Sequence, residues 1–210
     1  MESDGFPPGF FDRADTGDDS LFYALPRLVT HIDGQAIAEV GKLYRDLGLA
    51  SGHVLDLMSS WVSHFLDEPD RLTVLGMNRA ELDANPIATE RIVTDLNADP
   101  VIPLAAASVD HAVCCVSVDY LTRPIDVFRE VARVLVPGGL FVCTFSNRLF
   151  PTKAVRGWLS TGDAEHVRIV AAYFLRSGAF DEPVAKTLIP VGLGSDPLYA
   201  VWAQSRRADH

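Results

Sequence analysis

The sequence places an acid, two hydroxyl groups and an imidazole around the end of a short apolar run. The run is Val54–Leu57, which contains Asp56, and the residues after it are Met58, Ser59, Ser60 and Trp61. In a doubly wound α/β domain such a run is the first strand, and the turn after it lies at the mouth of a cofactor crevice. Asp56 is therefore a candidate binding residue. His64, a little further on, is a candidate general base, although a lone histidine there also suits a structural role.

The turn departs from the pattern that usually binds a cofactor. Glycines normally stand there, because a residue without a Cβ lets backbone amides approach the ligand. Here Met58, Ser60 and Val62 occupy the three positions. The hydroxyls of Ser59 and Ser60 could replace the amides in binding a carboxylate, and Trp61 suits either the core or a place over the ligand.

Polar residues also follow the next apolar runs. Asn78 comes after Leu72–Gly76, about twenty residues beyond Asp56, which is the spacing at which this kind of fold contacts a ribose. Asp95 and Leu96 follow the third run. Since the carboxyl ends of parallel strands share one edge of a sheet, we expect these side chains around one crevice.

Two later strand ends supply candidates for catalysis and substrate binding. Asp119 and Tyr120 follow the apolar run Val109–Val118. Asp119 could accept a proton from a substrate, and Tyr120 could line the pocket or orient the nucleophile. Asn147 and Arg148 follow the fifth run, and Arg148 could hold an acidic substrate through two parallel hydrogen bonds. A turn acid, a half-buried tyrosine and a surface arginine are the alternative interpretations.

Helices are expected between these strands. Asp33 can cap a helix whose apolar stripe ends just before Gly48. Further helices are predicted near Ser60, over residues 78–85, from Pro124 to Pro137 and from Asp163 to Gly178. The runs Val184–Val191 and Leu198–Gln204 are joined by a loop too short for a crossover helix, which predicts an antiparallel hairpin. The fold class is therefore α/β, with a doubly wound, mostly parallel sheet of seven strands that ends in this hairpin.

Composition narrows the class of protein and its partners. The 210 residues suffice for one domain, and a net charge of −10 argues against nucleic acid or an anionic membrane as a partner. No apolar run approaches the length of a membrane helix, and no signal peptide or metal cluster is apparent. The three cysteines lie in strand-like runs without metal spacing, which favours reduced thiols in a cytoplasmic protein. Residues 1–32 are expected to form an amino-terminal arm, which offers a contact for a homodimer, and residues 33–210 the domain.

Two segments carry a more specific signal. They are Val109-Asp110-His111-Ala112-Val113 and the stretch from Phe128 to Leu140, which reads F-R-E-V-A-R-V-L-V-P-G-G-L. Together they resemble the "SFD-x-V … F-x-E-x-x-R-V-L-x-P-G-G" run of class I S-adenosylmethionine-dependent methyltransferases of the small-molecule type 11 kind. The resemblance covers roughly residues 50–204.

The resemblance implies S-adenosylmethionine as the cofactor and assigns residues around it. Asp95 would bond the adenine amino group with Leu96 beside the ring, and Asn78 would meet the ribose hydroxyls where the family usually has an acid. The full implied cofactor set is Asp56, Met58, Ser59, Ser60, Trp61, Asn78, Asp95, Leu96 and Val116. The arm lids the pocket in this family, so Tyr23 and His31 are expected to touch the substrate.

Two functions are consistent with these observations. The first is methyl transfer from S-adenosylmethionine to a small-molecule acceptor, with Asp119, Tyr120 and His64 as catalytic candidates. The second is a methyltransferase fold whose cofactor site is lost or altered and which binds a ligand or catalyses another reaction. An NAD(P) oxidoreductase is disfavoured because no G-x-G-x-x-G is present and the chain closes with an antiparallel hairpin.

Overall fold

The computed structural model describes residues 5–206 and contains one mixed sheet. Its strands are β1 (His53–Leu57), β2 (Arg71–Gly76), β3 (Glu90–Val93), β4 (Val109–Cys115), β5 (Leu135–Phe145), β6 (Val184–Ile189) and β7 (Leu198–Gln204). They are ordered β3-β2-β1-β4-β5-β7-β6. Only β7 runs antiparallel to its neighbours, β5 and β6. The predicted α/β class, the seven strands and the closing hairpin are thus confirmed.

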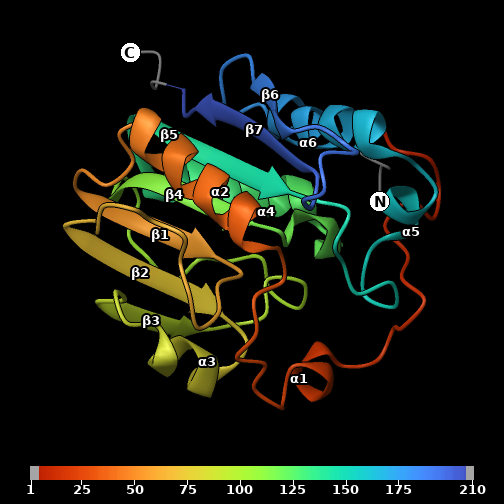
Figure 1. Cartoon of the computed structure of the whole chain (residues 1–210), viewed down its shortest axis with the longest axis horizontal. Coiled ribbons are helices and arrows are strands. Elements are labelled where there is room, and N and C mark those ends of the chain that lie inside the picture. The colour runs from red at the N-terminus through yellow and green to blue at the C-terminus, as the bar shows by residue number, and fades with distance from the viewer. Residues whose placement is uncertain (1–4, 207–210) are drawn as a thin grey trace.

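Helices cover both faces of this sheet (Figure 1). The α-helices are α1 (Asp19–Phe22), α2 (Gly34–Asp46), α3 (Arg79–Ala84), α4 (Pro124–Val134), α5 (Arg156–Leu159) and α6 (Asp163–Ser177). Alternate residues of a strand point to opposite faces, so Val113 and Val142 pack in the cluster under α2. Their neighbours Ala112 and Phe141 pack in the larger cluster with α4 and α6.

Local sequence signals account for most of the helix ends. The Asp33 carboxylate accepts hydrogen bonds from the backbone amides of Gln35 and Ala36, so it caps α2 as predicted. Gly178 ends α6 in the left-handed conformation with φ +72°. At the other end of α6 the cap is Gly162, and Asp163 instead lies in the first turn, where its carboxylate accepts a hydrogen bond from the Tyr199 hydroxyl.

The helix predicted near Ser60 does not form. Residues 58–70 contain neither helix nor strand. Met58 adopts a left-handed φ of +52°, and the Ser59 amide donates to the Leu75 carbonyl of β2 instead of entering a helical turn. Serine hydroxyls that bond nearby acceptors compete with helix formation, and Ser59 and Ser63 both donate to Asp56. The prediction of a helix near Ser60 was therefore wrong.

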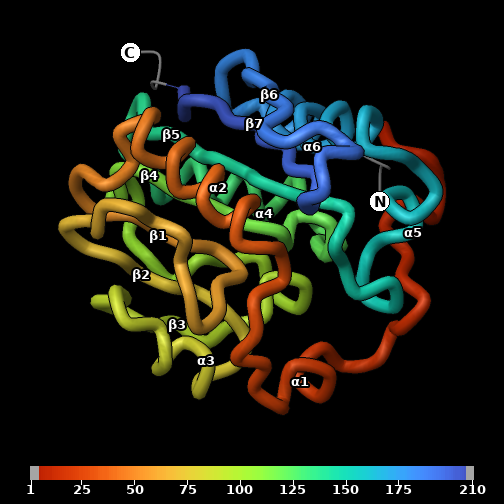
Figure 2. Tube along the Cα trace, viewed as in Figure 1, coloured from red at the N-terminus to blue at the C-terminus, as the bar shows by residue number. Residues whose placement is uncertain are grey.

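The amino-terminal arm is anchored to the domain at two places. Phe6, Phe10 and Phe11 pack against one another, and Phe6 and Phe11 contact the ring of Tyr173 on α6. The chain then runs past α5 and α1 toward α3 before it turns into α2 (Figure 2). Lys153, which is fully buried, forms ion pairs with Asp15 and Asp19 at 2.9 and 2.8 Å. A buried ion pair that loses one partner leaves an uncompensated charge, so Lys153 ties the arm to the domain.

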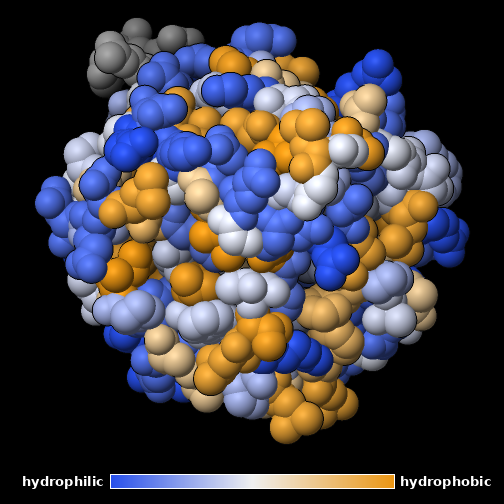
Figure 3. Space-filling view, in the orientation of Figure 1, coloured by the Kyte–Doolittle hydropathy of each residue, from blue (hydrophilic) through white to orange (hydrophobic). Residues whose placement is uncertain are grey.

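Residues 21–32 of the arm pack on the domain only in part. Ile32 is buried, but Leu21 and Leu25 are 76% and 77% exposed and Leu28 and Val29 more than half exposed. Figure 3 shows apolar surface along the lower right, where α1 and the arm run in Figure 1. The first four residues of the predicted arm lie outside the described residues. Between residues 5 and 206, no helix is long and apolar enough to cross a membrane.

The loop after β1 depends on a close approach to Gly76, which yields a stability prediction. A Cβ on Gly76 would lie 2.3 Å from the Ser59 carbonyl oxygen. We expect Gly76→Ala to lower the free energy of unfolding by about 1–3 kcal/mol, because the loop backbone must move. Urea denaturation followed by circular dichroism measures this.

Gly34→Ala is the matched control, since a Cβ there meets no atom within 4 Å. Its stability should be unchanged or slightly raised. Equal stability of wild type and Gly76→Ala would show that the loop does not lie against β2 as described.

Candidate functional site

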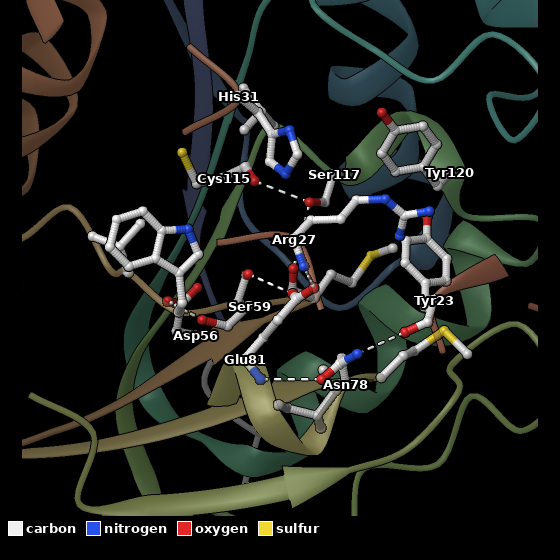
Figure 4. Close-up of a pocket in the computed structure, with 18 of the residues that line it drawn as sticks. Tyr23, Arg27, His31, Asp56, Ser59, Asn78, Glu81, Cys115, Ser117 and Tyr120 are labelled. Carbon is white, nitrogen blue, oxygen red and sulfur yellow. Dashed lines mark hydrogen bonds between the residues drawn. The ribbon is translucent and has the colours of Figure 1, made fainter. Parts of the chain in front are cut away.

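A cavity opens at the carboxyl ends of β1 to β4, where the arm crosses them (Figure 4). It encloses about 1270 Å³ of empty space, including the solvent at its mouth. The sequence-predicted residues that line it are Tyr23, His31, Asp56, Met58, Ser59, Ser60, Trp61, His64, Asn78, Asp95, Leu96, Val116 and Tyr120. Residues predicted from four separate strand ends therefore meet around one space.

Asp56 organises the loop on one side of the cavity. Its carboxylate accepts hydrogen bonds from Ser59 Oγ at 2.8 Å and Ser63 Oγ at 2.5 Å, and Asn85 donates to Ser63 Oγ in turn. Burial raises the pKa of Asp56 to about 6, although the two serine hydroxyls lower it. The carboxyl group is therefore occupied in shaping the loop.

The hydroxyls that were predicted to bind a ligand carboxylate are already engaged. Ser59 Oγ bonds Asp56, and Ser60 Oγ donates to Glu81 Oε2 at 2.6 Å. The Trp61 indole N–H donates to the Val29 carbonyl at 3.0 Å, so this side chain connects the loop to the arm. The hypothesis that Ser59 and Ser60 replace the missing glycine amides is thus not supported by their hydrogen bonds.

Asn78 and Glu81 hold the arm against the start of α3. Asn78 Oδ1 caps α3 by accepting from the Glu81 amide, while its Nδ2 donates to the carbonyls of Tyr23 and Ala24. Glu81 Oε1 accepts from the Arg27 amide at 2.7 Å. The sequence reasoning missed Glu81, although Asn78-x-x-Glu81 has the spacing of a capping box and signals a helix start.

Asp95 and Leu96 form the wall that follows β3. Asp95 Oδ1 accepts from the backbone amides of Asn97 and Ala98, so the carboxylate is fixed at the cavity edge. Leu96 is buried. Asn97, also missed from the sequence, bonds the Asp19 carboxylate and the Tyr120 carbonyl and so joins this wall to the arm and to the end of β4.

The segment after β4 has a constrained backbone. Val116 has φ +44°, a left-handed conformation that is costly for a β-branched residue. Ser117 Oγ donates to the Cys115 carbonyl at 3.0 Å, and all three residues line the cavity. Burial raises the pKa of the Cys115 thiol to about 12, so it stays protonated near neutral pH. Strain of this kind is stored at sites where geometry is needed.

Both predicted histidines line the cavity and are neutral near pH 7. Burial, and secondarily His31, lower the pKa of His64 to about 4. His64 Nδ1 is buried and has no hydrogen-bond partner among the described residues. The His31 ring meets Phe150 edge-on, with the ring centroids 5.3 Å apart. His64 therefore stays neutral near pH 7, and its low pKa makes it a weak base.

Three predicted residues are absent from the cavity wall. Asp119 is 3% exposed. It lies near Tyr120 and Tyr173, whose pKa values are raised by burial and secondarily by the Asp119 carboxylate. Asn147 and Arg148 also lie outside the lining, and the Arg148 guanidinium is exposed, with the Asp196 carboxylate 3.9 Å away. The edge of the sheet was identified correctly, but the turn after β4 and the chain after β5 direct these side chains elsewhere.

Arg27 is the residue that sequence reasoning missed most clearly. Of the described residues that line the cavity, it is the only lysine or arginine. Its guanidinium carbon lies 4.6 Å from the ring centroid of Phe22, 5.8 Å from that of Tyr23 and 5.5 Å from that of Phe150. No motif surrounds Arg27 in the sequence, so its position emerges only from the path of the arm.

Residues 45–143 match the family described as a methyltransferase domain. The sequence matches no curated protein significantly. Among described residues, no group of three His, Cys, Asp or Glu side chains could hold a metal ion.

Several solved structures share the fold. An S-adenosylmethionine-dependent methyltransferase from Aquifex aeolicus has 15% identity and a TM-score of 0.55, covering 82% of this chain and 98% of that one. A chain in the complex of the Haloferax volcanii Trm112 methyltransferase activator with a methyltransferase has 16% identity and a TM-score of 0.53, covering 83% and 95%. The [4+2]-cyclase SpnF has 13% identity and a TM-score of 0.55, covering 79% and 81%. At these identities the likeness concerns the fold.

The burial of Asp119 predicts a pH dependence of stability. Burial raises the pKa of Asp119 to about 8, whereas an unfolded chain has an ordinary aspartate value near 4. Between about pH 4 and 8 the unfolded state therefore loses a proton that the folded state keeps, and the free energy of unfolding falls as pH rises. Asp119→Asn removes this titration, so its stability should decline less over that range, by about a few kcal/mol in total.

Denaturant unfolding of both proteins from about pH 5 to pH 8 measures the difference. Asp56 titrates in both proteins and cancels in the comparison. Asp83→Asn, at a half-exposed carboxylate, is the control and should parallel the wild type. Parallel curves for Asp119→Asn and wild type would mean that Asp119 is ionised in the folded protein at neutral pH.

Proposed function

We propose that the chain transfers a methyl group from S-adenosylmethionine to a small-molecule acceptor, since residues 45–143 match the methyltransferase domain family and the fold is that of S-adenosylmethionine-dependent enzymes. The observation that carries the proposal is the cavity at the carboxyl ends of β1 to β4. In open α/β sheets this edge is where ligands bind. The arm closes the cavity from the side, which suits an acceptor small enough to be enclosed.

The residues present fit the cofactor best on its adenine side. Asp95 and Leu96 stand together at the end of β3, with the carboxylate fixed by backbone amides and the leucine buried. A carboxylate can accept the hydrogen bond of an adenine amino group, and leucine can cover the ring. Next along the edge, where the ribose would lie, the side-chain oxygens of Asn78 and Glu81 already accept hydrogen bonds from the protein.

S-adenosylmethionine would supply a methyl group already activated on a sulfonium, so the protein mainly aligns the acceptor. His64 is a neutral base on the cavity wall. The Tyr120 hydroxyl accepts a hydrogen bond from the Phe150 amide at 2.8 Å and keeps its own hydrogen, because burial raises its pKa. It can therefore orient an acceptor oxygen or nitrogen by donating a hydrogen bond.

A second candidate function follows from the loop after β1. The Ser59 amide bonds β2, and the hydroxyls of Ser59 and Ser60 bond acids of the protein itself. Those groups do not bind a methionine moiety in this arrangement, which favours a protein of methyltransferase fold with an altered cofactor site. That the fold supports other chemistry is illustrated by the [4+2]-cyclase SpnF.

The subdivision into a lid of residues 1–32 and a domain of residues 33–210 is part of the same proposal. Its support is that Tyr23, Arg27 and His31 of the arm line the cavity. A cytoplasmic location and a homodimer remain predictions.

Calorimetric titration with S-adenosylmethionine and S-adenosylhomocysteine tests the proposal. We expect the wild type to bind both, and Asp95→Ala to weaken binding at least about tenfold, because a hydrogen bond to a charged carboxylate is lost. Asp99→Ala, in the same loop, should bind like the wild type, since Asp99 is exposed and absent from the cavity wall.

Thermal unfolding of each variant checks that the fold is retained. A folded wild type that binds neither compound would rule out methyl transfer and support the altered-site alternative. Equal binding by Asp95→Ala and wild type would remove Asp95 from the cofactor site.

A further inference from the structure

The guanidinium of Arg27 is bonded to protein on one side only. Arg27 Nη2 donates to the Phe22 carbonyl at 2.8 Å. Arg27 Nη1 is buried and has no hydrogen-bond partner among the described residues. A guanidinium carries five N–H donors and cannot be deprotonated, and a buried donor without a partner is costly. The cavity that this residue lines therefore contains an unsatisfied, permanently charged donor.

Aromatic rings surround the guanidinium of Arg27. The rings of Phe22, Tyr23 and Phe150 lie around its guanidinium, as the distances above show, and Figure 4 shows the side chain reaching across the cavity toward Tyr23. Asp19, the acid of the arm that lines the same cavity, is already paired with Arg13 and Lys153. Among residues 5–206 no carboxylate forms an ion pair with Arg27. Its neighbours would favour an aromatic body beside an anion.

The position of the guanidinium separates it from the expected cofactor contacts. Asp95 and Leu96 follow β3, and Asn78 follows β2. Phe150, in contrast, belongs to the segment after β5, and Tyr120, whose hydroxyl accepts the Phe150 amide, belongs to the turn after β4. The Arg27 side chain therefore extends from the β2 side, where its amide bonds Glu81, to the side on which the acceptor would lie.

We propose that the acceptor is an aromatic carboxylic acid and that Arg27 binds its carboxylate. This inference rests on the proposed methyl transfer and names the substrate class of the same site. A carboxylate matches the planar fork of a guanidinium and carries one negative charge. A phosphate monoester carries nearly two, and the cavity wall offers a single arginine to balance them. In this proposal Arg27 binds the acidic substrate, a role that the sequence predicted for Arg148.

Fluorine NMR titration of the protein saturated with S-adenosylhomocysteine tests this inference. The probes are 4-fluorobenzoate and its neutral counterpart 4-fluorobenzamide. We expect the wild type to bind the acid at least about tenfold more tightly than the amide, because the charged hydrogen bonds to Arg27 are made only by the acid. In Arg27→Gln the preference should fall to nearly one, and Arg27→Lys should retain part of it.

The controls separate this inference from the proposed function. Affinity for S-adenosylhomocysteine, measured first, should be the same in wild type and Arg27→Gln. Arg123→Gln, which alters an exposed arginine at the start of α4, should leave the acid preference intact. Absence of S-adenosylhomocysteine binding in the wild type would contradict the proposed function itself rather than the role of Arg27.

Four outcomes would overturn the assignment. In the first two, the wild type fails to bind 4-fluorobenzoate or binds the acid and the amide equally well. In the other two, Arg27→Gln keeps the preference for the acid, or Arg148→Gln loses it. Loss of S-adenosylhomocysteine affinity in Arg27→Gln would instead assign Arg27 to the cofactor carboxylate. Tighter binding of phenyl phosphate than of 4-fluorobenzoate would replace the carboxylate with a phosphate.

Discussion

The hydrogen bonds from Ser59 and Ser63 to Asp56 determine the shape of the site. They draw the chain after β1 back onto the strand end, so that no helix begins there and the loop backbone lies against Gly76 of β2. The same loop then presents Ser60 to Glu81 and Trp61 to the arm. If Asp56 did not hold both serines, neither the wall on this side of the cavity nor the contact with the arm would be defined.

The arm is the second constraint, because it supplies part of the cavity wall. Buried Lys153 fixes it near α1, and the aromatic cluster of Phe6, Phe10 and Phe11 fixes it against α6. Between these anchors and α2, the arm brings Tyr23, Arg27 and His31 to the cavity. The site therefore combines a sheet edge common to many α/β proteins with a wall built by residues outside that sheet.

The parts that could be predicted from the sequence are those that depend on local patterns. Alternating and continuous apolar runs identified the strands, Asp33 and Gly178 marked helix ends, and strand ends located the crevice. Asp119 and Arg148 could not be placed in this way, because a turn of one residue more or less reverses the direction of a side chain. Arg27 and Glu81 were missed since their roles arise between segments far apart in the chain. The loop after β1 does not form the predicted helix, because side-chain hydrogen bonds outweigh its apolar pattern.

The bonds that hold residues 23–29 of the arm over the cavity share one property. Asn78 donates to the carbonyls of Tyr23 and Ala24, Trp61 donates to the carbonyl of Val29, and Glu81 accepts from the amide of Arg27. On the arm's side every one of these partners is a backbone group, which every amino acid except proline supplies in full. Side chains of residues 23–29 can therefore be exchanged by mutation while the path of this stretch stays the same. Such a wall can evolve toward new ligands, one side chain at a time, without first losing the enclosure that makes binding selective.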